Sequence, residues 1–265
     1  MLCADDFGLS AAVDRGILRL VSRSRLSAVS CLVNMPDWAA GARALKAAPA
    51  VRAGLHFNLT EGRPLAPALA RVWPQMPALQ QLITLAHLHR LPVAALREEL
   101  HAQLAAFEQA RGQPPEHIDG HQHVHHLPQL RALVLELLAA RPRMAVRHTG
   151  RLPGRGFAVK RLLIEGTGGR AMGQLIQKLG RQANSHLLGV YDFAEPNYRR
   201  LMQAWLAELP GSGGMIFCHP GEADEHDKGA DAPIDAIAAA RVRELAYFDS
   251  EAFIDDLLAA DVTLV

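Results

Sequence analysis

The chain has 265 residues, of which 49% are hydrophobic, so it can bury a large core as a single domain over residues 1–265. Its net charge is +1 and it has no block of like charge, so nothing in the composition indicates a nucleic acid or an anionic membrane as a partner. Because no apolar stretch reaches transmembrane length and no signal peptide precedes the first strand, we expect no membrane span and a cytoplasmic location. Cys3, Cys31 and Cys218 lie far apart in apolar runs, which predicts buried free thiols in a reducing compartment.

Strand-like and helix-like segments alternate along the whole chain. Apolar runs predict strands at Met1–Ala4, Ser27–Asn34, Arg52–Leu59, His117–His123, Met144–His148, His186–Phe193, Gly214–Cys218 and Val262–Val265. Helical periodicity predicts helices at Ala11–Ser22, Ala39–Ala47, Val93–Arg111, Pro128–Ala140, Ala171–Ala183, Glu195–Glu208, Pro233–Phe248 and Ser250–Ala259. This alternation favours an α/β fold, an irregular (β/α) barrel of seven to eight parallel strands with the helices outside.

Two segments do not follow the alternation. Pro64–Leu91 is rich in Pro and Leu and predicts an inserted loop with some helix, and Arg151–Gly169 predicts a loop. The first predicted strand begins at Met1, so we expect the chain to start a few residues short of its natural strand. No G-x-G-x-x-G follows that strand, which argues against a dinucleotide-binding fold.

In such a barrel, chemistry takes place at the carboxyl ends of the strands, so the residues at these ends are candidates for a site. Asp5 and Asp6 end the first strand, and adjacent carboxylates suit a metal-dependent hydrolase, in which one holds a cation and the other accepts a proton. An Asx-turn that leaves the strand is the competing interpretation. The other strand ends carry Asn34, His56, Asn58, Asp119, His121, Arg147, His148, His219 and Glu222.

Most of these residues also have an ordinary structural explanation. His56 fits a hydrogen-bonded core histidine, and Asn34 before Met-Pro fits a turn. Arg147 fits the solvated end of a strand, and His219 before Pro-Gly fits a strand-ending turn.

The histidine-rich segment after His117 carries the strongest signal. On a strand, residues two apart face the same side, so Asp119, His121, His123 and His125 are predicted to form one polar row. Burying such a row without a metal, substrate or water costs several kcal/mol. One Asp and two His from three strands would supply three ligands to one divalent ion and leave positions open for water and substrate. Zinc is the first choice from the imidazoles, and magnesium, manganese and cobalt also fit the carboxylates.

Four motifs support a family resemblance over nearly the whole chain. They are Ala4-Asp-Asp-Phe-Gly-Leu-Ser10, Gly54-Leu-His-Phe-Asn-Leu-Thr60, His117-Ile-Asp-Gly-His-Gln-His-Val-His125 and Cys218-His-Pro-Gly221. In this order they resemble the signatures of the YdjC-like carbohydrate deacetylases, which include the chitooligosaccharide deacetylases and a group associated with hopanoid biosynthesis. Gly120 and Gln122 depart from the residues that this family often carries, but neither departure removes a ligand.

The resemblance implies an irregular barrel and metal-dependent removal of acetyl groups from N-acetylated sugars. It implies Asp6, His56 and His121 as ligands of one divalent ion, Asp5 as the general base and His219 as the acid. It places His123 and His125 as substrate contacts or supports of the ligands, and we assign Asp119, Asn34 and Arg147 to the same group. As the acid, His219 would have to be charged in the reactive complex.

Several alternatives stay open at this point. The enzyme could act on an N-acetylated glycolipid precursor in place of chitobiose-like oligosaccharides. A glycosidase could pair Asp5 with Glu222 or Asp119, and a sugar-binding protein without activity could use the same barrel. The expected partner is a small carbohydrate, and the expected assembly is a homodimer, the commonest closed oligomer.

Overall fold

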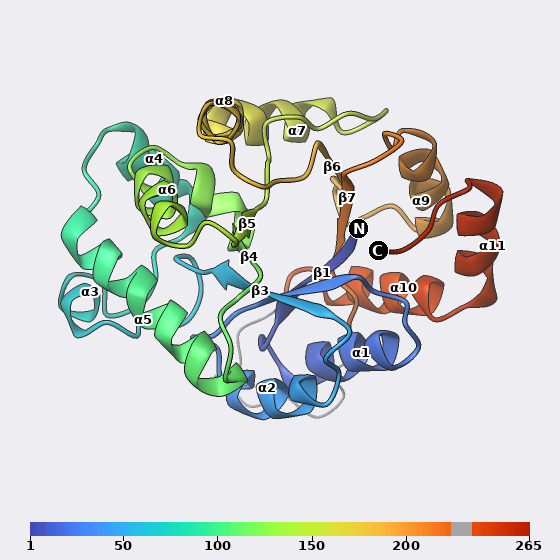
Figure 1. Ribbon diagram of the computed structural model, residues 1–265, viewed down its shortest axis with the longest axis horizontal. Coiled ribbons are helices and arrows are strands. Elements are labelled where there is room, and N and C mark those ends of the chain that lie inside the picture. Colours follow the sequence, from blue (N-terminus) through green and yellow to red (C-terminus); the bar gives the residue numbers. More distant parts are fainter. Residues whose placement is uncertain (224–234) are drawn as a thin grey trace.

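The computed structural model describes residues 1–223 and 235–265 and places one parallel sheet at the centre of the protein (Figure 1). Its seven strands have the order β5-β4-β3-β2-β1-β7-β6. They are β1 (Leu2–Phe7), β2 (Ala28–Cys31), β3 (Arg52–Phe57), β4 (His117–Gly120), β5 (Ala145–Val146), β6 (His186–Leu188) and β7 (Gly214–Cys218). All neighbouring strands are parallel, so the predicted α/β alternation is confirmed.

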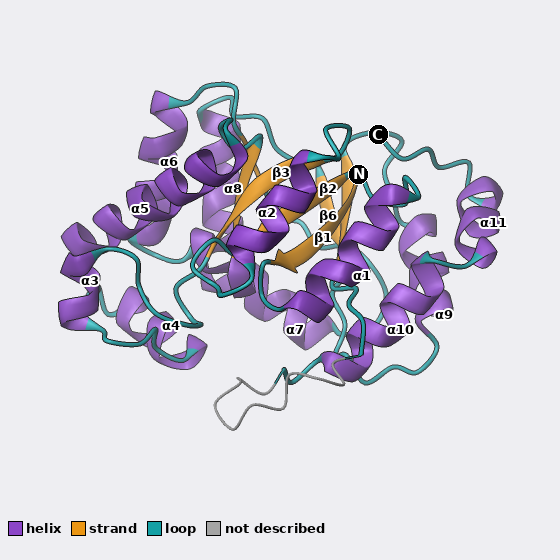
Figure 2. Cartoon of the chain, turned by 90° about the horizontal axis from the view of Figure 1, so that it is seen from below, coloured by secondary structure: helices purple, strands orange, loops and turns teal. Residues whose placement is uncertain are grey.

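Helices surround this sheet, as the turned view also shows (Figure 2). They are α1 (Ala11–Ser22), α2 (Trp38–Lys46), α3 (Pro67–Val72), α4 (Leu79–His87), α5 (Val93–Arg111), α6 (Leu130–Ala140), α7 (Ala158–Ile164), α8 (Arg170–Lys178), α9 (Tyr198–Ala207), α10 (Ala238–Phe248) and α11 (Glu251–Ala259). Helix α1 illustrates why they form. Ser10 accepts a hydrogen bond from the Val13 amide at its first turn, and Val13, Ile17 and Leu20 bury one face of the helix.

The sheet is curved, and its two edge strands are β5 and β6. In the described part of the chain, the segments at these edges are joined by an isolated bridge between Val146 and Ala183 and by a hydrogen bond from the Leu187 amide to the Arg151 carbonyl. Helices α7 and α8 cover this side of the protein (Figure 1). Over residues 1–223 and 235–265, the structure thus supports a curled sheet of seven parallel strands, without an eighth.

The eighth strand predicted at Val262–Val265 is wrong, because these residues follow α11 without strand structure. Val262 and Leu264 pack against the core and alternate with exposed residues, which produces a strand-like pattern. The place that an eighth strand takes in a closed barrel, between β7 and β1, is not available because these two strands pair with each other.

Two segments interrupt the alternation of strands and helices, and one of them contains more helix than we predicted. The insertion at Pro64–Leu91 contains α3 and α4, in agreement with the expected mixture of loop and helix. Arg151–Gly169, predicted as a loop, contains α7 and a π-helical turn at Glu165–Gly169. The predicted helix start at Pro233 lies outside the described residues.

All three cysteines are buried and free, as predicted. Over residues 1–223 and 235–265, no helix combines the length and the apolar character that crossing a bilayer requires.

Candidate active site

A β-bulge in β1 turns Asp5 and Asp6 to the same side of the sheet. Ala4 pairs with Val29 and Phe7 pairs with Cys31, so β1 holds one more residue than β2 over this stretch. Asp6 accommodates the bulge by adopting a φ of 68°, in the left-handed region. Regular alternation would point the two carboxylates to opposite faces. Instead, both are buried and both approach His56, whose Nε2 lies 3.5 Å from Asp6 Oδ1 and 4.0 Å from Asp5 Oδ2.

His56 is oriented by its neighbour on the next strand. His56 of β3 and Asp119 of β4 are register partners, and His56 Nδ1 donates to Asp119 Oδ1 at 2.6 Å. Burial opposes a charged ring, but Asp119 and Asp5 raise the pKa of His56 to about 10. With Nδ1 engaged in this way, Nε2 points toward the Asp6 carboxylate and is the ring nitrogen that could bind a cation.

The histidine-rich segment is not the continuous strand that we predicted. Strand β4 ends at Gly120, and His121–His126 form a short 3-10 helix interrupted by left-handed Gln122 and His123. The predicted row of side chains on one strand face is therefore wrong. Gly120 allows this turn, because a Cβ there would lie 2.6 Å from the His125 backbone nitrogen.

Asp5, Asp6 and His56 form a group that is here called the carboxylate cluster. Of the histidines on the segment His121–His126, His121 reaches this cluster. Its Nδ1 lies 2.9 Å from Asp6 Oδ1, and its Nε2 lies 3.1 Å from Glu61 Oε1. Burial opposes a charged ring, but Asp6 and Glu61 raise the pKa of His121 to about 9. His121 thus lies between two carboxylates, as His56 does.

The loop that carries Glu61 is fixed by two asparagines. The Asn58 side chain accepts hydrogen bonds from the Thr60 and Glu61 amides at 3.0 and 3.1 Å. Asn34 accepts a hydrogen bond from Asn58 at 2.9 Å and donates to the Glu61 carbonyl at 3.1 Å. Asn34 therefore holds the loop beside His121, and these contacts give it a positioning role.

Arg147 forms ion pairs with both Asp5 and Asp119. Its guanidinium donates to both oxygens of Asp5 at 2.6 Å and lies 2.6 Å from Asp119 Oδ2. Ser30 also donates to Asp119 Oδ2, at 2.6 Å. Arg147 is almost fully buried, which excludes the interpretation of it as a solvated strand end. Burial of the Asp119 carboxylate is offset by Arg147 and His56, which hold the pKa of Asp119 well below its usual range.

Asp6 is held by a residue from the far end of the chain. Arg241 of α10 donates to Asp6 Oδ2 at 2.8 Å and to Asp235 at 2.6 Å. Burial opposes the carboxylate form, but Arg241 and His121 hold the pKa of Asp6 well below its usual range. Asp6 Oδ1 is buried and has no well-aligned hydrogen bond in the described structure.

This arrangement fits a divalent cation. Asp6 Oδ1 and one nitrogen each of His56 and His121 lie within 4.8 Å of one another. They form a set of one carboxylate and two imidazoles, and an ion among them would satisfy the unbonded Asp6 oxygen. Two other buried groups of this kind, Asp5–His56–Asp119 and Cys3–His117–Asp119, contain carboxylates that Arg147 already neutralises.

His219 follows β7, and its backbone and ring are both enclosed. Its amide donates to Glu244 Oε2 at 2.5 Å, and Glu244 Oε1 accepts a hydrogen bond from the Tyr191 hydroxyl. The ring lies edge-on to Phe193 and Phe217, at centroid distances of 5.2 and 5.5 Å. Burial lowers the pKa of His219 to about 4, although Asp6 and Asp5 oppose this shift. The ring is therefore neutral at pH 7 in the free protein.

His123 and His125 make their contacts outside the carboxylate cluster. His125 is fully buried and donates from Nε2 to the Arg147 carbonyl at 3.0 Å. His123 lies edge-on to Phe217 at 5.4 Å, and burial and His126 lower its pKa well below the usual range. His125 thus supports the backbone of Arg147, while His123 packs on the aromatic ring that also touches His219.

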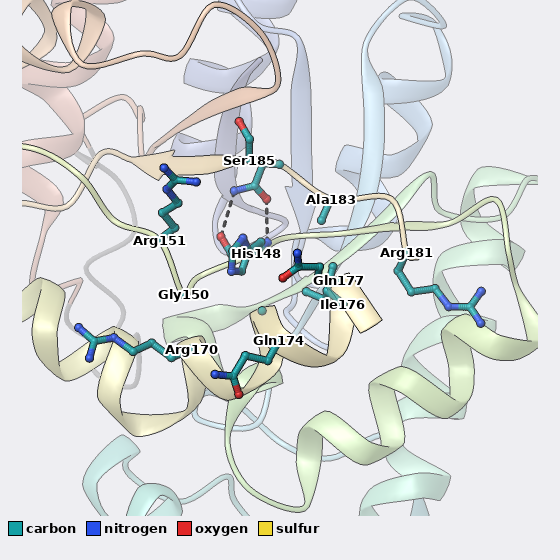
Figure 3. Close-up of a pocket in the computed structure, with 12 residues that line it drawn as sticks. His148, Gly150, Arg151, Arg170, Gln174, Ile176, Gln177, Arg181, Ala183 and Ser185 are labelled. Carbon is teal, nitrogen blue, oxygen red and sulfur yellow. Dashed lines mark hydrogen bonds between the residues drawn. The ribbon is translucent and has the colours of Figure 1, made fainter. Parts of the chain in front are cut away.

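His148 lies in a different pocket from the carboxylate cluster. It lines a cavity of about 530 Å³ together with Arg151, Arg170, Gln174 and Arg181, and Figure 3 shows how these side chains lie around it. Asn184 accepts a hydrogen bond from the His148 amide at 2.7 Å and donates to its carbonyl at 2.9 Å. None of the residues proposed as ligands or catalysts lines this cavity.

Comparisons with known proteins agree with these motifs. A family model described as YdjC-like protein matches residues 1–259. A chitooligosaccharide deacetylase of Proteus mirabilis is 36% identical over 140 residues, which cover 50% of this chain and 52% of that protein. A carbohydrate deacetylase of Mus musculus is 38% identical over 159 residues, covering 58% and 50%.

A carbohydrate deacetylase of Geobacillus stearothermophilus is 37% identical over 146 residues, covering 54% of this chain and 57% of that protein. The matched regions thus span about half the length of these relatives. A crystal structure of an Enterococcus faecalis V583 protein whose suggested activity is cellobiose-phosphate cleavage has a TM-score of 0.77, with 19% identity. It covers 100% of this chain and 95% of that one, and it shows the fold alone. Because the family model extends over nearly the whole sequence, the chain belongs to the YdjC-like protein family.

Proposed function

We propose that this protein is a metal-dependent hydrolase that removes acetyl groups from N-acetylated sugars. The observation that carries the proposal is the buried Asp6 Oδ1, which has no well-aligned hydrogen bond from the described residues and faces nitrogens of His56 and His121. The deacetylase names of the relatives support the same class of reaction. Asp6, His56 and His121 would hold one divalent ion, with zinc as the first choice and magnesium, manganese or cobalt as substitutes.

A bound divalent ion would polarise the acetyl carbonyl and lower the pKa of a water molecule. The protein's own residues supply the remaining steps. Asp5 accepts the proton of the attacking water, and Arg147 fixes both Asp5 oxygens in place. Asp119 and Glu61 orient the rings of His56 and His121.

His219 is the proposed proton donor to the departing amine. Because the ring is neutral in the resting protein, it must take a proton from solvent in the reactive complex, after the substrate has bound, and pass it to the amine. The proton that Asp5 accepted from the attacking water then leaves to solvent. The edge-on contacts with Phe193 and Phe217 and the hydrogen bond to Glu244 fix the position of the residue. His219 therefore has a defined place beside the cluster before any substrate arrives.

Chitobiose-like oligosaccharides are the proposed substrates, and an N-acetylated glycolipid precursor is the alternative. The glycosidase alternative gains no support from the carboxylates that it would need. Glu222 pairs with Arg15 and Arg19 near the surface, and Asp119 is engaged by Arg147, Ser30 and His56. The proposed homodimer can be tested by sedimentation velocity.

The deciding experiment measures acetate release from N-acetylglucosamine oligomers of different lengths, with and without a chelator. The proposal expects acetate release that is lost with the chelator and restored by a divalent ion. Release of a shorter sugar without acetate would replace the proposal with the glycosidase alternative. Binding of the oligomer to metal-replete protein without any turnover would replace it with a sugar-binding protein.

A further inference from the structure

Helix α7 exposes an apolar face that nothing in the described structure covers. Val159, Leu162 and Leu163, here called the α7 patch, are 73%, 57% and 61% exposed. Their spacing of three and four residues places them on one side of the helix. Helix α7 has no buried residue, which is unusual for a helix with this many large aliphatic side chains.

This clustering distinguishes the α7 patch from the other exposed aliphatic side chains of the described residues. Those are spread over separate elements, at Leu65, Val72, Leu88, Leu179, Val242, Leu258 and Val265. Isolated exposed aliphatic residues are common on protein surfaces and need no explanation. Three exposed aliphatic side chains on a single short helix indicate a surface that contacts a membrane or another molecule.

The segment around the patch has more basic than acidic residues, a local excess that the near-neutral composition of the whole chain conceals. Arg151–Arg170 contains five basic residues and one acidic residue, a local excess of four positive charges in a chain whose net charge is +1. The acidic residue is Glu165, which pairs with Arg170 at 2.6 Å. Arg151 and Arg155 are exposed, on the loop that leads into α7. Exposed aliphatic side chains flanked by arginine and lysine are the combination that binds the interface of an anionic bilayer.

We propose that the α7 patch and its flanking basic residues dock this protein onto an anionic phospholipid surface. Electrostatics favours this occupant over a second copy of the chain, because a two-fold contact would bring the two basic segments against each other. Nothing in this proposal depends on the reaction that the protein catalyses.

The patch would also be linked to the carboxylate cluster. Lys160 of α7 donates to the Tyr191 carbonyl at 2.6 Å and lies 4.3 Å from the centre of the Phe193 ring. Phe193 in turn lies edge-on to His219. Docking through Val159, Leu162 and Leu163 would therefore place the surface of the bilayer on the side of the protein that leads to His219.

The test measures cosedimentation of the purified full chain with vesicles of phosphatidylcholine alone or with about 30% phosphatidylglycerol. We expect binding to the anionic vesicles that weakens at least about fivefold in the double variant Leu162→Ser/Leu163→Ser, and also when salt is raised to about 0.5 M. Arg155→Glu should weaken binding as well. Leu258→Ser removes a comparably exposed leucine from α11 and should leave binding unchanged.

Each of three results would overturn the proposal. The first is equal binding to neutral and anionic vesicles or to neither, and the second is an equal effect of the α7 and α11 variants. The third is a self-associated wild-type protein that Leu162→Ser/Leu163→Ser converts to a monomer without any change in vesicle binding, which would assign the patch to a second copy. The far-UV circular dichroism spectrum and the thermal unfolding midpoint should be the same in the wild-type and patch variants, which establishes that the variants are folded.

Discussion

Asp119 Oδ1 accepts a hydrogen bond of 2.6 Å from His56 Nδ1, and this contact leaves His56 Nε2 directed at Asp6. Supporting carboxylates of this kind typically contribute 10–100-fold to metal affinity. We expect Asp119→Asn to raise the metal dissociation constant by about that factor, as measured by competition with a chromophoric chelator. The control is Asp256→Asn, at a buried carboxylate that pairs with Arg199, and it should leave the metal dissociation constant unchanged. Unchanged affinity in Asp119→Asn would remove the orienting role.

The two adjacent carboxylates should have separable functions. Asp6→Asn should lose both metal and activity, since an amide is a weaker ligand than a carboxylate. Asp5→Asn should keep the metal but lose turnover by about 10²-fold or more, because the proton acceptor is gone. Elemental analysis and acetate release distinguish these outcomes. If the two variants exchanged their phenotypes, the roles of Asp5 and Asp6 would have to be exchanged as well.

Metal binding should release protons. The pKa of His56 is raised to about 10 and that of His121 to about 9, so both rings are charged at pH 7 in the metal-free protein. A cation binds neutral imidazole, so about two protons should leave, and affinity should rise steeply with pH up to about pH 9. Calorimetry in buffers with different ionisation enthalpies counts these protons. Glu61→Gln should lower the count, because the hydrogen bond that the Glu61 carboxylate accepts from His121 helps to raise the pKa of His121.

His219 can be tested through the leaving group. His219→Gln should slow turnover of an N-acetyl sugar much more than turnover of an activated acetyl ester, whose leaving group needs little proton assistance. Because burial lowers the pKa of His219 to about 4, kcat/KM of the wild-type protein should show no inflection from this ring between pH 6 and 8. Equal losses on both substrates would assign His219 to positioning.

Asp14 should make the protein less stable as the pH rises. It accepts a hydrogen bond from the Gly8 amide at 2.5 Å, and its Oδ2 is buried without a hydrogen-bond partner among the described residues. Burial raises its pKa to about 7. Because this folded-state pKa lies above the unfolded value of about 3.9, the contribution of Asp14 is complete below about pH 4 and is lost toward pH 7. Asp14→Asn should therefore flatten the pH dependence of urea unfolding between pH 4 and 7. Exposed Asp255→Asn is the control, and an unaltered profile in Asp14→Asn would contradict the assignment.

The sequence predicted those parts of the fold that depend on local periodicity. Helices α1 and α5 begin and end at the predicted residues, and Asp6, His56 and His121 meet because parallel strands end at one edge of a sheet. The predicted strand row failed for a backbone reason, since Gln122 and His123 adopt left-handed conformations after Gly120. Periodicity cannot detect such a turn, although the glycine was a local signal.

Other site residues could not be predicted because they depend on contacts between distant segments. Arg241 reaches Asp6 across 235 positions of the sequence, and Glu244 meets the His219 amide one helical turn further along α10. Nothing in the composition of α10 marks these two residues. Glu61 lies inside a motif that the sequence did indicate, but its role became visible only when the Asn34 and Asn58 contacts placed it beside His121.

The position of β1 in the sheet has a consequence for the order in which the protein folds during synthesis. Strand β1 lies between β2 and β7, so one of its edges stays unpaired until Gly214–Cys218 has left the ribosome. An unpaired strand edge is a template for association with other chains, and inward-pointing charged residues are a common protection against it. Asp5 and Asp6 would provide that protection in the unfinished chain. The carboxylates proposed to act in the finished protein would thus also keep the nascent one from aggregating.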